Sequence, residues 1–319
     1  MASPLKIWFV TDIHGSDICF RKSVNAISHF GLDVLIIGGD ISGKYTIPVV
    51  EAAKGAWTAE YAGKKFVLEH SELASFETML ANAGAYAFRC DPQTARRFRS
   101  DGAFREAIDE NMRTARLKSW VELADQRLKN SSAMVLINGG NDDHYYIDPV
   151  LDSSETMTHP EDMIVELPDG LSVVSTGHAN ITPWHCPREL DEAKLEQRID
   201  RKVSQIADFA RCIFNLHCPP KNSLLDQAPK LDSQLRIVMS AFGIVEESVG
   251  SSAVRSAIKK YQPCVSLHGH VHEAFACERF GRTLAFNPGS EYAGGLLRGV
   301  YLEFDNGRLS FYELTREMA

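Results

Sequence analysis

Seven polar side chains of types that bind metal ions follow predicted strands in this chain of 319 residues: Asp12, His14, Asp40, Asn141, His217, His270 and His272. In extended backbone, residues two apart project to the same side, so Asp12 and His14 can face one site. His270 and His272 have the same spacing. Loops at the carboxyl ends of parallel strands meet at one edge of a sheet. We therefore expect the five segments that carry these residues to converge on one pocket.

The donor atoms of this set indicate a class of metal and a class of reaction. Two carboxylates, one amide and four imidazoles suit two divalent transition metal ions (Mn, Fe, Zn, Co or Ni) rather than Ca or Mg, which prefer oxygen ligands alone. Two such ions about 3.5 to 4 Å apart hold the attacking and leaving oxygens of an in-line displacement at phosphorus, and they acidify a bound water. The residues therefore predict metal-dependent hydrolysis of a phosphate ester.

Hydrophobic patterns place these residues on an α/β scaffold. Residues 5–10, 16–30 and 34–37 read as strand, helix and strand, which is a βαβ unit of a largely parallel sheet. Residues 134–137, 213–216 and 265–267 predict further strands, and each precedes a candidate ligand. Other segments predict a hairpin, two helices and a turn, at residues 165–174, 189–210, 254–260 and 305–307.

Residues 44–130 form a predicted helical insertion, since the stretch between Asp40 and Asn141 is longer than one crossover helix requires. It either caps the pocket and contacts substrate or serves as a structural pad or dimer contact. Five arginines in it form a solvated face with local ion pairs or grip the non-reacting part of the substrate: Arg89, Arg96, Arg97, Arg99 and Arg105.

Composition restricts the class of protein further. Apolar residues make up 44% and charged residues 24%, with no apolar run near the roughly 18 residues that cross a bilayer. A net charge of -8 favours neither nucleic acid nor an anionic membrane as partner. Seven cysteines, an odd number without a C-x-x-C pair, indicate reduced thiols. We expect one cytoplasmic domain over residues 1–319, neither secreted nor membrane-bound; its oligomeric state stays open.

The ordered motifs resemble those of the calcineurin-like metallophosphoesterases. That family's pattern is D-x-H, GD, GN-x-[DE], H and GH-x-H, and this chain carries all five blocks in order, from Asp12 to His272. Within the family, three segments are most similar to the Icc-related predicted phosphoesterases: the GNDD stretch, residues 180–184 and residues 287–290. The resemblance implies an αββα sandwich, two mixed sheets flanked by helices.

The resemblance also implies how the metals are held. One ion would be bound by Asp12, His14, Asp40 and His272. The other would be bound by Asp40, Asn141, His217 and His270. Asp40 would then bridge the two ions. The implied substrate is a phosphate ester, attacked by a hydroxide that bridges the metals.

One position departs from the family. Many members have a histidine directly after the ligating asparagine, where it assists the leaving group, and this chain has Asp142 there. Two dications, two carboxylates and a hydroxide leave roughly one positive charge, which an ionised Asp142 would cancel. Either Asp142 keeps a proton and donates it to the leaving oxygen, or it orients a metal-bound histidine while His144 or His178 stands nearer the leaving group. Asp142 and His178 are therefore the candidate catalytic residues.

Three functions fit this sequence. The first is a phosphomonoesterase or phosphodiesterase acting on a small molecule or nucleotide, favouring activated leaving groups because the usual histidine is missing. The second is a noncatalytic scaffold, which the complete ligand set argues against, because buried Asp and His without metal are costly. The third is a single-strand nuclease, which the net negative charge argues against.

Overall fold

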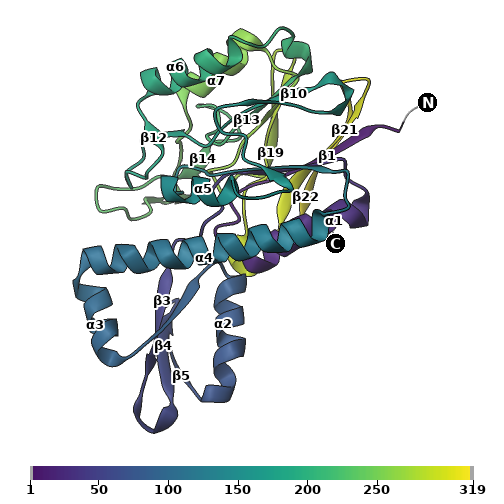
Figure 1. Ribbon diagram of the computed structural model, residues 1–319. Helices are drawn as coiled ribbons and strands as arrows, with labels where there is room; N and C mark the ends of the chain where they lie inside the picture. The colour runs from purple at the N-terminus through teal and green to yellow at the C-terminus, as the bar shows by residue number, and fades with distance from the viewer. Residues whose placement is uncertain (1–2, 317–319) are drawn as a thin grey trace.

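Two mixed six-stranded sheets form the centre of the computed structural model, which describes residues 3–316 (Figure 1). The first sheet has the order β22 (Arg308–Arg316), β21 (Arg298–Asp305), β1 (Leu5–Val10), β2 (Val34–Gly38), β7 (Met134–Asn138) and β8 (Met157–Thr158). The second has the order β19 (Ala276–Phe280), β20 (Thr283–Asn287), β18 (Val265–Leu267), β13 (Cys212–Leu216), β10 (Ser172–Thr176) and β9 (Ile164–Glu166). The central strands of each sheet run parallel.

Strand β1 shows why the sheets pack face to face. Its side chains alternate between two cores: Ile7 and Phe9 join residues of both sheets in the inner core, and Trp8 and Val10 face an outer helical layer. A strand buried on both faces reads as a continuous apolar run, which is why periodicity of two is absent from residues 5–10. The predicted βαβ unit is confirmed.

Helices cover both outer faces (Figure 1). On the first sheet lie α1 (Asp17–Phe30) and the second half of α4 (Gly102–Leu128), with α5 (Asp148–Leu151) beside them. On the second sheet lie α6 (Glu192–Val203) and α7 (Ser252–Tyr261). The predicted αββα sandwich is confirmed. Helix α6 is shorter than predicted because β12 (Glu189–Leu190) pairs with β11 (Ala179–Asn180), and Asp191 then caps the helix.

The insertion contains a sheet as well as helices. The predicted helices are present as α2 (Leu73–Asn82), α3 (Pro92–Ser100) and α4. A four-stranded sheet was not predicted; it consists of β5 (Lys64–Leu68), β4 (Trp57–Tyr61), β3 (Thr46–Glu51) and β6 (Tyr86–Cys90). The insertion therefore contains the expected helices and, in addition, a sheet that was not expected. In Figure 1 this unit projects from the sandwich on the far side of α4, with a small apolar core of its own.

A hairpin arm at residues 227–248 extends from the second sheet's side of the molecule. Its base is the pair β14 (Gln227–Pro229) and β17 (Glu246–Ser248), and its outer part is the pair β15 (Met239–Ser240) and β16 (Gly243–Ile244). No element was predicted for these residues. Among the described residues, no helix combines the length and apolarity that crossing a bilayer requires.

Candidate metal centre

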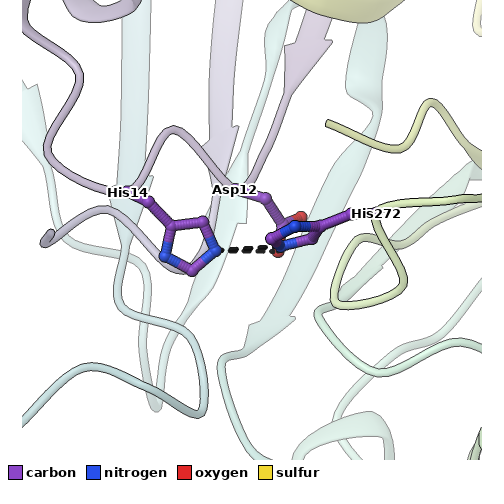
Figure 2. A group of neighbouring side chains, drawn as sticks. All are labelled: Asp12, His14 and His272. Carbon is purple, nitrogen blue, oxygen red and sulfur yellow. Dashed lines mark hydrogen bonds and ion pairs between the residues drawn. The ribbon is translucent and has the colours of Figure 1, made fainter. Parts of the chain in front are cut away.

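The first group of candidate ligands joins the two sheets. Asp12 and His14 follow β1, and His272 comes from the loop after β18 (Figure 2). His14 Nε2 lies 2.9 Å from His272 Nε2, and His272 Nε2 lies 3.4 Å from Asp12 Oδ1. His14 Nε2 is also 3.7 Å from Asp40 Oδ2, which follows β2. The donor atoms of Asp12, His14 and His272 all lie within 4.8 Å of one another.

The second group adjoins the first at Asp40. His217 Nε2, directly after β13, lies 3.4 Å from Asp40 Oδ1. The amide oxygen of Asn141 lies 3.1 Å from His217 Nε2 and 2.8 Å from His270 Nδ1. The structure thus brings together all seven residues that the sequence singled out, in the two sets that the family resemblance implies.

The loops that carry these ligands have unusual backbone conformations. Four candidate ligands have positive φ: Asp12 (53°), His14 (38°), Asp40 (48°) and His270 (67°). For non-glycine residues this conformation costs about 1 to 3 kcal/mol and persists only where the surroundings enforce it. Such strain clusters at functional sites. Four of the twelve described non-glycine residues with positive φ are thus candidate ligands, which is consistent with a functional site at these loops.

Two motif glycines are required by close approach. A side-chain carbon on Gly140 would lie 2.2 Å from Asp40 Oδ1, and one on Gly269 would lie 2.2 Å from Asp12 Oδ2. Real Cβ atoms do not approach other atoms this closely. The glycines of the GN and GH motifs therefore let the loops after β7 and β18 pack directly against the two carboxylates.

Residues outside the ligand set hold the loops together. Asn287 Nδ2 donates to the carbonyl oxygens of Gly269 and Val271, at 2.9 and 3.2 Å, and so fixes the loop that carries His270 and His272. Ser290 Oγ donates to the carbonyl oxygen of Asp12 at 2.7 Å. These contacts give a structural role to the segment at residues 287–290, which the sequence marked only by its family resemblance.

Asp143 is the most heavily used of these supporting residues. Its buried carboxylate accepts from the backbone amides of Ile41, Ser42 and Gly140 at 2.8 to 2.9 Å, and from the Ser42 hydroxyl. It therefore clamps the loop after Asp40 to the loop before Asn141. The second aspartate of GNDD was the available sequence signal, since it occupies the acidic position of the GN-x-[DE] motif.

We expect Asp143→Ala to lower the free energy of unfolding by about 3 kcal/mol or more, because four buried donors lose a charged acceptor. Urea unfolding of the metal-free protein, followed by circular dichroism, measures this change. Asp152→Ala is the matched control, since Asp152 is exposed and pairs only with His159 at 2.9 Å in the described structure. The control should change stability by less than about 1 kcal/mol. Equal losses in both variants would contradict the clamp.

Electrostatics at the site reflect two buried carboxylates among imidazoles. Burial raises the pKa of Asp40 to about 6, with a further contribution from the negative charge of Asp142. Burial opposes protonation of His217, but the charges of Asp40 and Asp12 outweigh it and raise the pKa of His217 to about 9. Burial and the charge of His217 lower the pKa of His270 to about 3. The metal-free centre therefore keeps a proton on His217 that a bound cation would displace.

The donor chemistry of the centre fits divalent metal ions. In the part of the chain that the structure describes, every ion pair of the buried Asp12 and Asp40 carboxylates is with a histidine. The proton that His217 keeps balances at most one of the two buried carboxylates, so added cations would stabilise the cluster. His217 Nδ1 donates to the carbonyl oxygen of Gly38 at 3.2 Å, which leaves Nε2 directed at Asp40 and Asn141. This is the orientation that a metal-ligating histidine needs.

Asp142 is paired with a lysine that the sequence did not single out. Lys44 Nζ lies 2.6 Å from Asp142 Oδ2, and Cys186 Sγ lies 2.8 Å from Asp142 Oδ1. Burial favours a protonated Asp142, but the charges of Lys44 and His14 outweigh it and hold the pKa of Asp142 below its ordinary value. Without metal and substrate Asp142 is therefore ionised, and proton donation by Asp142 in the presence of substrate stays a prediction. Lys44 also restores the positive charge that an ionised Asp142 removes from the centre.

The other expectations for residues near the leaving group receive no contact in support. In the described structure no hydrogen bond joins Asp142 to a histidine, as an orienting role would require. His178 is buried and bonds to Tyr145 Oη and Thr176 Oγ1 at 3.1 Å each, with Glu161 Oε1 at 3.6 Å. His144 stacks on Tyr146. Neither histidine contacts the seven ligands among the described contacts, so a role at the leaving group stays a prediction for both.

A cavity of about 1270 Å³ opens from the metal centre. Asp40, Asn141, His270 and His272 line one end of it, together with Asp142 and Lys44. Residues 180–184 and the hairpin arm line the rest. The insertion contributes Lys44, Tyr45 and Arg113, whereas none of the five predicted arginines reaches the cavity. Arg89 instead pairs with Glu77, and Arg97 with Asp101, as a solvated face predicts.

Comparison with known proteins shows which solved structures share the fold of this chain. No family model matches the chain. The uncharacterized protein MJ1162 of Methanocaldococcus jannaschii is 23% identical over 141 residues, which are 44% of this chain and 57% of that protein. The chain thus matches a little over half the length of this relative. TT1561 of Thermus thermophilus superposes with a TM-score of 0.54 at 13% identity, over 98% of this chain and 99% of that one.

Another crystal structure superposes over 98% of this chain and 99% of its own, with a TM-score of 0.57 and 14% identity. Superposition over the whole length, on two mixed sheets between helices with the candidate ligands at the strand ends, decides the architecture. The chain shares the fold of these crystal structures, and in this chain that fold is an αββα sandwich. YfcE, a phosphoesterase from E. coli, matches at a TM-score of 0.34 and 14% identity over 97% of this chain and 98% of that one.

Proposed function

We propose that this protein is a dinuclear metal-dependent phosphoesterase that hydrolyses a phosphomonoester or phosphodiester. The observation that carries the proposal is the convergence of seven oxygen and nitrogen donors from both sheets at one end of the cavity. When bound, two divalent ions would acidify the attacking water and stabilise negative charge on the phosphoryl group. One ion would be held by Asp12, His14, Asp40 and His272. The other would be held by Asp40, Asn141, His217 and His270.

In this proposal Lys44 supplies the positive charge that the family's histidine would provide at the position where this chain has Asp142. Its ammonium lines the cavity beside the metal centre and is about one third exposed, at 35%. Asp142 holds it there and takes up only one of its three donors. The remaining N–H groups are free to donate to a phosphoryl or leaving-group oxygen as negative charge develops. In this proposal Lys44 contacts the substrate and Asp142 positions Lys44.

Two alternatives are less well supported by the geometry. A noncatalytic scaffold would have no need of strained backbone at four ligands or of an open cavity at the metal centre. A nuclease would need a basic channel for the strand. In the described part of the chain, the cations that line the cavity are Lys44 and Arg113. Arg113 is already bonded to the Gly43 carbonyl oxygen and to Tyr146 Oη.

Metal analysis followed by turnover tests the proposal. We expect purified protein to bind about two divalent ions per chain and to hydrolyse p-nitrophenyl phosphate or bis-p-nitrophenyl phosphate after addition of Mn. A chelator should abolish turnover, and Mn, Fe, Co, Ni or Zn should restore it to different extents. Elemental analysis gives the stoichiometry, and release of nitrophenolate gives the rate. Absence of bound metal and of turnover with every metal and both esters would contradict the proposal and favour the scaffold.

A further inference from the structure

Beyond the metal centre the cavity has apolar walls on two sides. One wall is the loop at residues 180–184, where Ile181 and Trp184 are 56% and 61% exposed. The opposite wall is the hairpin arm, where Leu231, Leu235 and Ile237 line the same cavity. Leu235 and Ile237 are 47% and 51% exposed. Apolar side chains left open around a site that binds a polar group mark a place for a ligand.

Hydrogen bonds tie the base of the arm to the loop at residues 180–184. Asp226, fully buried at the base of the arm, accepts from the amides of Asn222, Ser223 and Gly250 at 2.9 to 3.1 Å. Asn180 Nδ2 donates to the carbonyl oxygen of Val249 at 3.1 Å, which ties the loop at residues 180–184 to that base. The base of the arm and the loop at residues 180–184 are therefore held together before any ligand binds.

Charge divides the cavity into two ends. Lys44 lies at the metal end, beside Asp142. Along the arm the charged side chains are acidic or already paired: Asp232 Oδ2 lies 2.8 Å from Arg236, and Glu247 lies 4.0 Å from Lys230. A second phosphate or a polyanionic strand would meet acidic groups there and no unpaired cation among the described residues. An uncharged apolar group would replace water from Trp184 and Ile237 instead.

We infer that the ester cleaved at this centre carries one phosphate and an alkyl or aryl group, which lies between Trp184 and the arm. This inference rests on the proposed function and narrows its substrate class. It excludes nucleoside polyphosphates and oligonucleotides, because their additional phosphates would lie along the arm, where Arg236 and Lys230 already pair with Asp232 and Glu247. The phosphate occupies the metal end with Lys44, and the apolar group supplies binding free energy away from the reacting atoms.

A homologous series of esters tests the inference. The Mn-loaded protein is assayed with p-nitrophenyl phosphodiesters whose second ester group is methyl, butyl or octyl. We expect kcat/KM to rise about tenfold from methyl to butyl and further to octyl, since each buried methylene favours binding about twofold to fourfold. A readout without turnover is calorimetric binding of methyl phosphate and octyl phosphate, in which octyl phosphate should bind at least tenfold more tightly.

Variants of the two walls identify the binding site. Trp184→Ser and Ile237→Ser should flatten the dependence of kcat/KM on chain length, because the alkyl group loses the apolar side chains against which it lies. Phe242→Ser is the matched control, since Phe242 is fully exposed at the tip of the arm and does not line the cavity. It should keep the full dependence on chain length. Thymidine 5′-p-nitrophenyl phosphate should be a poorer substrate than the octyl ester.

The outcomes separate this inference from the proposed function. Hydrolysis of the methyl ester with no gain from chain length, or with the same gain in Trp184→Ser and Ile237→Ser, would overturn the inference and leave the phosphoesterase standing. A second result would also overturn the inference: the length of the alkyl chain has no effect on hydrolysis, and the Ile237 and Phe242 variants lose dimerisation or binding to phosphatidylcholine vesicles. The apolar residues of the arm would then bind a second copy of the chain or a membrane. No hydrolysis of any ester would contradict the proposed function, while octyl phosphate binding would still decide the apolar site.

Discussion

Asp40→Asn should lower kcat/KM for an aryl phosphodiester by about 10³-fold to 10⁴-fold, because it removes the one carboxylate that both groups of ligands share. Asp40 Oδ2 lies 3.7 Å from His14 and Oδ1 lies 3.4 Å from His217. The Asp142 backbone amide donates to Asp40 Oδ1 at 3.0 Å, and an asparagine side chain keeps an oxygen that can accept this bond. It has no negative charge to hold two cations. Steady-state kinetics on Mn-loaded protein and elemental analysis measure the loss of activity and of metal together.

The same variant should not destabilise the metal-free protein. The pKa of Asp40 is raised to about 6, so this carboxyl contributes stability while it is protonated and loses that contribution as pH rises through about 6. At pH 7.5 the charged form is therefore unfavourable in the metal-free fold, and asparagine relieves it. Thermal unfolding in a chelator, read by circular dichroism, gives the comparison.

Asp305→Asn, at the exposed end of β21, is the matched control and should change neither activity nor metal content. A large loss of metal-free stability in Asp40→Asn would show that its low activity reports unfolding. Unchanged activity and metal content in Asp40→Asn would contradict a centre shared through Asp40.

The sequence predicted the ligands because their positions depend on local rules. A buried parallel strand is recognisable as a short apolar run, and the residues directly after it lie at the carboxyl edge of the sheet. Asp12, Asp40 and His217 are placed by this rule alone. Asn141 and the His270 and His272 pair follow the same rule, with a glycine before each segment that allows the close approach.

Lys44 escaped prediction because its role depends on tertiary structure. It follows Asp40 by four positions, but its contact is Asp142, which lies beyond the whole insertion. Opposite charges far apart in sequence give no pattern that a single sequence reveals. The sequence showed that Asp142 follows the ligating asparagine, but it did not show that the Lys44 ammonium lies against Asp142.

The strands of the insertion were missed for a different reason. They are five or six residues long and mostly half-buried or exposed, so they lack the continuous buried apolar run that marks the central strands. The hairpin arm carries its apolar residues on the cavity wall and at an exposed tip, where no core imposes a periodicity. Short elements outside the main core leave the weakest pattern in a sequence.

Lys44→Met should lower kcat/KM by about 10²-fold, because it removes a charged donor to the phosphoryl group and leaves the Asp142 carboxylate unpaired beside an anionic substrate. Replacing Asp142 as well removes that repulsion. We therefore expect Lys44→Met/Asp142→Asn to be about tenfold more active than Lys44→Met alone, and Asp142→Asn alone to stay within about tenfold of the unmodified protein. Lys64→Met, at an exposed lysine of β5, is the control and should have no effect.

The pH dependence of Asp142→Asn separates a positioning residue from a proton donor. Because Lys44 and His14 hold the pKa of Asp142 below its ordinary value despite burial, the carboxylate is ionised from about pH 5 to pH 9 and carries no proton to donate. The profile of Asp142→Asn should then keep the shape of the unmodified protein over this range. A different result would make Asp142 itself the catalytic acid. In that case the unmodified protein would lose activity at rising pH while Asp142→Asn would not, and the double variant would be no more active than Lys44→Met. The pairing with Lys44 argues that the cation, rather than the carboxylate, meets the departing oxygen.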